Sequence, residues 1–265
     1  MENTSWHKQQ VNEPLFPNLL WSRPQNKRQA GKLLIAGGNA HGFSQVASAY
    51  QAAIGSGAGA VKVLLPDALY KIAGGLIEDA EFAPSTKSGS FASNALAQFQ
   101  DLSHWADGIF LAGEFGRNAE TTILLEKYTN RSSKPTVLTK DTLDNFYSGS
   151  EHLFSNQNIC LAAALPQLQK LCMAAGSHQP ITLGMDLIKL VEALHTLSAK
   201  YSCHIITEHH AQFIVASSGQ VSTTKIKNST QNWQIETSSS AAVWWLQNPG
   251  KPFEALTAAV YEPGQ

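Results

Sequence analysis

Residues 31–66, GKLLIAGGNAHGFSQVASAYQAAIGSGAGAVKVLLP, decide the fold class. Residues 32–36 are a short apolar run that Gly37-Gly38 ends, which is typical of a buried strand followed by a tight turn. Apolar residues then recur at helical spacing up to three closely spaced glycines, and a second apolar run, AVKVLL, follows. The stretch therefore predicts a strand, a helix and a parallel strand, joined by a right-handed crossover.

The same alternation continues along the chain and predicts a doubly wound sheet. After it we expect a β-hairpin across Ser217-Ser218-Gly219 and two closing helices, at 238–246 and 253–261. The fold class is therefore α/β, with a central, mostly parallel sheet between two layers of helices. The other predicted strands are 107–113, 135–139, 158–161 and 203–207, and the other predicted helices are 120–128, 165–172 and 185–200.

The chain divides into an arm and one domain. Residues 1–30 contain Pro14, Pro17 and Pro24 with apolar residues between them, a pattern that indicates an extended N-terminal arm. No internal repeat and no linker divides residues 31–265, which we predict to form a single domain.

Charge and composition exclude several classes of partner. The 265 residues include 19 basic and 20 acidic side chains, so the formal net charge is -1. Binding to nucleic acid or to an anionic membrane needs a broad positive excess, and neither partner is expected. The chain also has no apolar run long enough to cross a bilayer, and its first residues, MENTSWHKQQ, lack the pattern of a secretory signal. We therefore expect the protein in the cytoplasm.

The sequence does not indicate a metal site. Cys160, Cys172 and Cys203 are widely separated in apolar stretches, which favours buried free thiols. The only adjacent histidines, His209-His210, would point to opposite faces of a strand and would be badly arranged to chelate one ion.

Candidate binding loops follow the predicted strands, because ligands of open α/β sheets bind outside the carboxyl ends of the strands. The loop at 37–44, GGNAHGFS, would let the backbone approach an anion at a helix start, or would serve only as a turn needed for packing. The chain contains neither the dinucleotide pattern G-x-G-x-x-G in this loop nor the phosphate loop G-x-x-x-x-G-K-[ST].

The order of several segments resembles a known family. GKLLIAGGN, GSGAGAVKVLLP, DGIFLAGEFGR, KPTVLTKDTL and PFEALTAAVY are together similar to the ATP- or ADP-dependent NAD(P)H-hydrate dehydratases of the ribokinase-like superfamily. The resemblance spans residues 15–262 and is strongest at 31–66. It implies a ribokinase-like fold and a homo-oligomer. It also implies a small-molecule nucleotide substrate and the use of ATP or ADP with Mg²⁺ to remove water from hydrated NADH or NADPH.

The resemblance implies four substrate-binding residues. The family loop G-P-G-L-G-R, which closes over substrate, aligns with residues 112–117 and keeps Gly116 and Arg117. Asp141 keeps one carboxylate of the family's D-A-D-A-L, and Ser44 falls near the small residue that faces the substrate. Glu114, however, places a negative charge in the substrate loop, where it would repel a phosphate.

Three other family positions are degenerate. T-P-H-P-G-E aligns with residues 162–167, so that Ala164 replaces the histidine and Gln167 the glutamate. The strand L-K-G-A-G, whose lysine contacts nucleotide phosphates, aligns with residues 207–211 and has Glu208 in place of that lysine. Phosphate contact would become unfavourable there.

The family's G-[ST]-G-D stretch is also replaced. Its glycines form an anion hole at a helix start and its Asp is the family's catalytic base, but residues 232–240 contain no glycine. Glu236 falls at the position of the Asp and is the candidate catalytic residue. Alternatively, Glu236 or Thr237 is only the N-cap of a helix that begins near Ser238.

Two hypotheses follow, and whether the protein is an enzyme stays open between them. The protein is either a divergent NAD(P)H-hydrate dehydratase, a carbon-oxygen lyase with Glu236 as its base, or a catalytically inactive homologue that acts as a binding or structural subunit.

Overall fold

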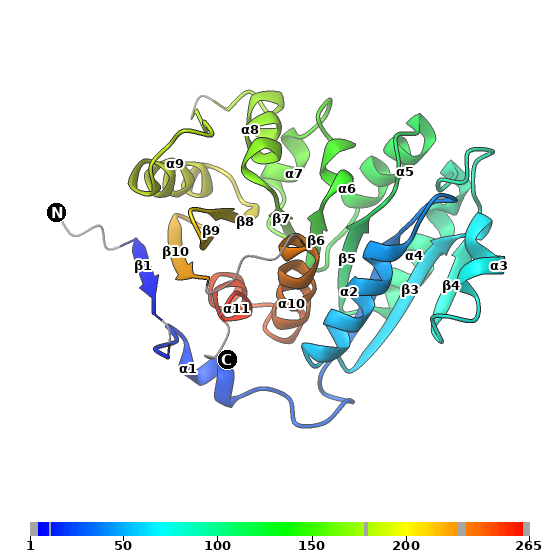
Figure 1. The fold of residues 1–265 in the computed structure, drawn as a ribbon, viewed down its shortest axis with the longest axis horizontal. Helices are drawn as coiled ribbons and strands as arrows, with labels where there is room; N and C mark the ends of the chain where they lie inside the picture. Colours follow the sequence, from blue (N-terminus) through cyan, green and yellow to red (C-terminus); the bar gives the residue numbers. More distant parts are fainter. Residues whose placement is uncertain (1–4, 11, 178–179, 227–231, 262–265) are drawn as a thin grey trace.

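The computed structural model describes residues 5–10, 12–177, 180–226 and 232–261 (Figure 1). Its strands are β1 (Trp6–Gln9), β2 (Lys32–Gly37), β3 (Ala60–Pro66), β4 (Ala80–Ala83), β5 (Gly108–Gly113), β6 (Thr136–Thr139), β7 (Ile159–Ala162), β8 (His204–His209), β9 (Gln212–Ser217) and β10 (Gln220–Lys225). Its α-helices are α1 (Pro17–Trp21), α2 (Ser44–Gly55), α3 (Tyr70–Ala73), α4 (Leu96–Trp105), α5 (Ala119–Thr129), α6 (Asp141–Asp144), α7 (Glu151–Ser155), α8 (Leu165–Ala174), α9 (Leu187–Lys200), α10 (Trp233–Gln247) and α11 (Pro252–Ala259).

All ten strands form one sheet, in the order β1-β10-β9-β8-β7-β6-β5-β2-β3-β4. Among these described strands, the pairings of β9 with β8 and with β10 are antiparallel and the others are parallel. The chain leaves β2 towards β3 and β4 and then returns to place β5 on the other side of β2. This reversal makes the gap between the carboxyl ends of β2 and β5 a topological switch point, where open α/β sheets bind ligands.

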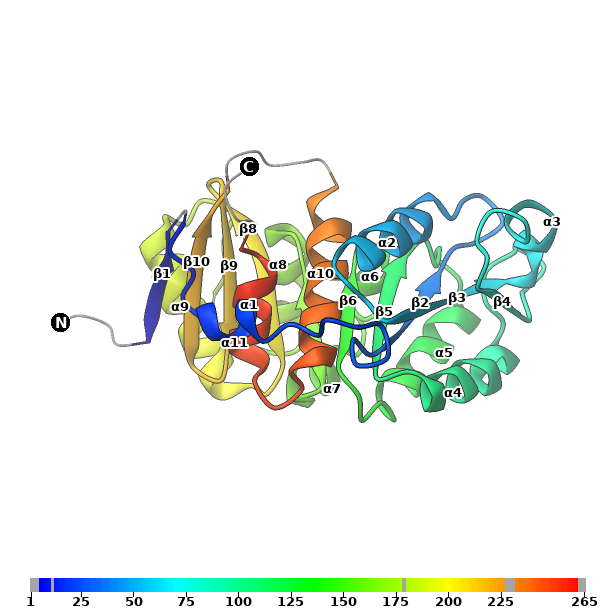
Figure 2. The ribbon, with the colours of Figure 1, turned by 90° about the horizontal axis from the view of Figure 1, so that it is seen from below.

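Helices cover both faces of the sheet (Figure 2). They bury two apolar cores against it. One core packs α4, α5, α7, α8 and α9 against the sheet through residues such as Phe99, Leu153 and Leu194. The other packs α2, α10 and α11 against the opposite face, with Trp244 and Trp245 buried in it. The predicted α/β fold with a mostly parallel sheet between two helical layers is confirmed.

The N-terminal arm extends the sheet. Strand β1 pairs in parallel with β10 and forms one edge of the sheet. The side chain of Gln9 is buried and donates to Thr224 Oγ1 (3.0 Å) and to the Thr257 carbonyl (3.1 Å), while its oxygen accepts from the Leu15 amide (3.0 Å). The sequence indicated an extended arm but did not predict this strand.

The hairpin predicted across Ser217-Ser218-Gly219 is confirmed as β9 and β10. All three cysteines are free and buried, as expected. The predicted helix at 238–246 starts too late, because α10 begins at Trp233. No helix within the described ranges combines the length and the apolar character that crossing a membrane requires.

Candidate functional site

The loops at the carboxyl ends of three parallel strands, β2, β5 and β6, carry the predicted substrate residues. Ser44 begins α2 after β2, Gly116 and Arg117 follow β5, and Asp141 begins α6 directly after β6. Gln167 lies in the first turn of α8, after β7. The structure therefore brings the predicted substrate residues and Gln167 to one edge of the sheet.

Glu114 fastens the loop after β5 to the start of α2. Its carboxylate accepts from Ser44 Oγ (3.0 Å) and from the Gln45 amide (2.9 Å). Its backbone carbonyl accepts from Asn39 Nδ2 (2.7 Å). A negative charge is favourable at a helix N-terminus, so Glu114 stabilises this arrangement. The predicted substrate residue Ser44 is therefore already bonded to a carboxylate of the chain.

The backbone of Glu114 keeps a conformation that suits glycine. Its φ of 58° lies in the left-handed region, which costs a non-glycine residue about 1 kcal/mol or more. The dehydratase loop that the sequence resembles has glycine at this position. Glu114 thus places a charged side chain at a backbone conformation that glycine adopts more readily.

Asp141 closes the other side of the loop after β5. Its Oδ2 accepts from the Gly116 amide (3.0 Å), while Oδ1 is buried and has no hydrogen-bond partner among the described residues. Burial raises the pKa of Asp141, and the amides of Gly116 and Glu114 oppose that rise. Two predicted substrate residues are therefore in direct contact.

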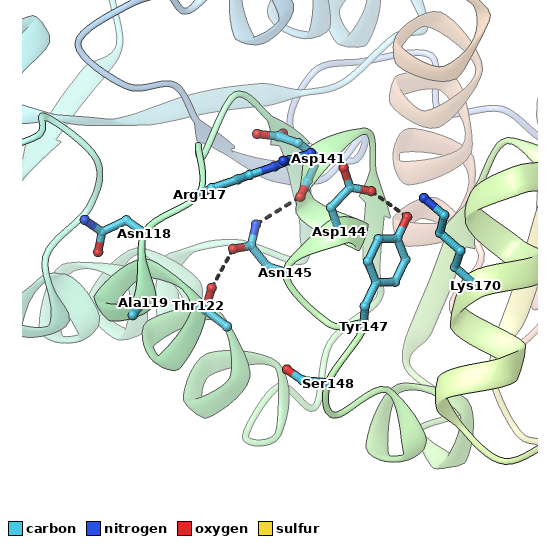
Figure 3. A pocket seen from close by; sticks show the side chains of 10 residues that line it. All are labelled: Arg117, Asn118, Ala119, Thr122, Asp141, Asp144, Asn145, Tyr147, Ser148 and Lys170. Carbon is cyan, nitrogen blue, oxygen red and sulfur yellow. Dashed lines mark hydrogen bonds between the residues drawn. The ribbon is translucent and has the colours of Figure 1, made fainter.

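Asp141 and Arg117 line a cavity of about 590 Å³ that also includes Lys170 on α8 (Figure 3). Asp144 accepts a hydrogen bond from the Tyr147 hydroxyl (2.7 Å). Burial is the main cause that raises the pKa of Tyr147, and the Asp144 carboxylate raises it further. Two cations and two carboxylates line this cavity, so that its charges balance.

Gln167 and Gln234 join the end of β7 to the start of α10. Gln234 Nε2 donates to Gln167 Oε1 (3.0 Å) and to the Ala162 carbonyl (3.1 Å). Gln167 Nε2 donates in turn to the Lys140 carbonyl (2.9 Å) and to Asp144 Oδ1 (3.1 Å). Gln167 was expected only as a degenerate family position, and no local pattern pointed to Gln234, because its partners are distant in the sequence.

The first turn of α10 differs from the predicted one. The amides of Ile235 and Glu236 both donate to the Asn232 carbonyl (2.9 and 3.3 Å), so the helix start satisfies these donors itself. Glu236 lies exposed in this first turn. The alternative that Glu236 or Thr237 caps a helix beginning near Ser238 is therefore wrong, because the helix begins five residues earlier.

The positions aligned with the family's phosphate-binding strand carry no lysine or arginine. Glu208 is half-buried near the end of β8, and the next residue, His209, bonds to the Met185 carbonyl through Nε2 (2.8 Å). Ala164, the other degenerate position, is half-buried and precedes α8. Within the described ranges, no group of three or more His, Cys, Asp or Glu side chains could hold a metal ion.

Comparison with known proteins gave matches among solved structures. A scan of protein families and a search of curated proteins gave none. A ribokinase-like superfamily protein from Enterococcus faecalis matches with a TM-score of 0.72 and 17% identity, covering 98% of this chain and 87% of that one. The fold is ribokinase-like.

Two further solved structures share this ribokinase-like fold. A hypothetical protein from Streptococcus mutans has a TM-score of 0.68 and 16% identity over 90% of this chain and 83% of its own. The ADP/ATP-dependent NAD(P)H-hydrate dehydratase from Bacillus subtilis, co-crystallized with ATP/Mg²⁺, has a TM-score of 0.67 and 14% identity over 94% and 86%. The resemblance to the dehydratases is thus confirmed at the level of the fold.

Proposed function

We propose that this protein is a non-catalytic homologue of the NAD(P)H-hydrate dehydratases that acts as a binding or structural subunit. The proposal rests on the hydrogen bonds at the start of α10. Gln234, in the first turn, bonds to both Gln167 and the Ala162 carbonyl, and it is 8% exposed. The Ile235 amide in the same turn already donates to the Asn232 carbonyl, so a phosphate at this helix start would compete with existing hydrogen bonds, each worth about 1 kcal/mol.

The side chains at the family's nucleotide-contact positions, in the first turn of α10 and near the end of β8, do not fit a magnesium nucleotide. The first turn carries the side chains of Trp233 and Ile235, where the family has glycines. Glu208 stands where the family has a lysine, and a carboxylate repels phosphate oxygens. We therefore assign this chain no step of nucleotide chemistry.

Thermal unfolding with and without ligand tests the proposal. A ligand at 100 times its Kd stabilises a folded protein by about 2.7 kcal/mol, which raises the Tm by several degrees. We expect MgATP and MgADP to leave the Tm of this protein unchanged. The Bacillus subtilis dehydratase, co-crystallized with ATP/Mg²⁺, is the positive control. A saturable rise in Tm with either nucleotide would contradict the proposal.

A divergent dehydratase is the second candidate, and the loop after β5 favours it. The Gly116 amide donates a hydrogen bond to Asp141, and Arg117 and Asp141 line one cavity. Turnover of NADPH hydrate in the presence of MgATP or MgADP, lost in the Asp141→Asn and Glu236→Gln variants, would support this candidate. Absence of turnover by the wild-type protein would exclude it.

A further inference from the structure

A second pocket opens beside the topological switch point. Its volume is about 520 Å³, and it lies between the loop after β2, the start of α2 and the loop after β5. This is the place where open α/β sheets bind ligands. Its walls are mainly apolar and aromatic, and they are formed by Phe43, Ala47, Tyr50, Leu76 and Ile77.

Glu114 places a fixed negative charge in this pocket. Ser44 Oγ and the Gln45 amide each bond to one oxygen of its carboxylate, which holds the group in place. Both groups are neutral donors, so they hold the carboxylate without cancelling its charge. Among the described residues, neither of the two salt bridges involves Glu114. Of the described residues that line the pocket, none is a lysine or an arginine, and the basic side chain among them is that of His41.

Further acidic residues lie near the aromatic wall. Burial raises the pKa of Tyr50, and the negative charges of Asp79 and Glu78 raise it further. These carboxylates add to the negative potential near the pocket. The cavity beside Arg117 has a different character, because its cations and carboxylates balance.

Aromatic rings and a carboxylate without an ion-pair partner favour the same kind of ligand. The face of an aromatic ring attracts cations, and a carboxylate without an ion-pair partner gains from one. Leu76, which is 71% exposed at the pocket, offers apolar surface that the body of a ligand could cover. An anion or a phosphate would instead be repelled by Glu114.

We propose that this pocket binds a small organic cation of the aromatic or quaternary ammonium class. The positive charge lies beside Glu114, and the apolar body of the ligand packs against Phe43 and Tyr50. This inference goes beyond the proposed loss of catalysis and does not depend on it, because α10 contributes no residue to the pocket.

Titration calorimetry with N-methylpyridinium tests the inference, with 3-methylpyridine at pH 8 as a neutral control of nearly the same size. We expect saturable binding of the cation and at least about tenfold weaker binding of the neutral compound. Equal affinity for the two compounds would overturn the inference, as would the absence of saturable cation binding up to about 10 mM.

One variant and a matched control test whether the cation binds beside Glu114. Glu114→Gln keeps an oxygen acceptor for Ser44 and removes the charge, so we expect about tenfold weaker cation binding. Glu81→Gln is the matched control, because Glu81 pairs with Lys62 (2.9 Å) and does not line the pocket. Circular dichroism checks that both variants are folded.

Phe43→Leu removes an aromatic face and keeps apolar bulk, so we expect a few-fold loss of cation binding. Because nucleotides are absent from these titrations, failure here would leave the proposed loss of catalysis standing. Cation binding that is unchanged in both Glu114→Gln and Phe43→Leu would place the ligand elsewhere and overturn the inference.

Discussion

Gly37 shows how a single residue sets the geometry of the switch point. It ends β2, and a Cβ atom added to it would lie 2.3 Å from the Gly113 carbonyl oxygen at the end of β5. The next amide, that of Gly38, donates to the same oxygen (3.0 Å). The close approach of these two strand ends allows Glu114 to reach the start of α2.

We predict that Gly37→Ala lowers the free energy of unfolding by about 3 kcal/mol, because a backbone oxygen cannot move aside as a flexible side chain can. Urea unfolding measures the change. Gly55→Ala is the control, since a Cβ there meets nothing within 4 Å and should cost little. Equal stability of the two variants would show that the strand ends can separate.

His204 gives the protein a pH dependence. Burial lowers its pKa to about 4 from 6.5, and the neutral ring lies between Ser217 Oγ (2.8 Å) and the Gln157 carbonyl (3.0 Å). Between pH 6.5 and 4, the unfolded chain takes up a proton that the folded chain does not. The free energy of unfolding should therefore fall by about 3 kcal/mol as the pH drops through this window.

Urea unfolding at several pH values checks this prediction. His204→Gln should flatten the pH dependence, while His210→Gln, which changes an exposed residue, should leave it as in the wild type. An equal slope in the wild type and in His204→Gln would assign the pH dependence to other groups.

Among the elements, β1 depends on one buried side chain. Gln9 is 3% exposed and joins β1 to β10, to the end of α11 and to the residues that lead into α1. The strand has only four residues, so its backbone pairing alone holds it weakly.

We predict that Gln9→Ala releases β1 from the sheet while the rest of the fold persists, at a local cost of about 2 kcal/mol. Hydrogen exchange should then speed up at the amides of β10 that pair with β1, and the central strand β5 should stay protected. Lys8→Ala is the control, because Lys8 is exposed on the same strand. Unchanged exchange in β10 would show that the backbone pairing suffices.

For the whole molecule, we predict a homo-oligomer, as the resemblance to the dehydratases implies. Several large apolar side chains of the described chain are exposed, among them Trp21 (85%) and Met173 (73%). Burial of such surface between copies is favourable. Sedimentation equilibrium should give a mass of at least two chains, and a single-chain mass at micromolar concentration would contradict this prediction.

Sequence determined the parts of this protein that rest on local patterns. The strand-helix-strand unit at 31–66, the hairpin at 212–225 and the buried thiols follow from apolar spacing and turn residues within short segments. The resemblance to a known family also placed Ser44, Gly116, Arg117 and Asp141 in loops that the structure brings to one edge of the sheet.

Only the tertiary structure decided which side chains in those loops bond to one another. The bond of Gln234 to Gln167 joins residues 67 positions apart, and that of Ser44 to Glu114 joins residues 70 apart. The early start of α10 and the pairing of β1 likewise depend on distant partners. No local pattern encodes such contacts, because their free energy arises only when the sheet has brought the segments together.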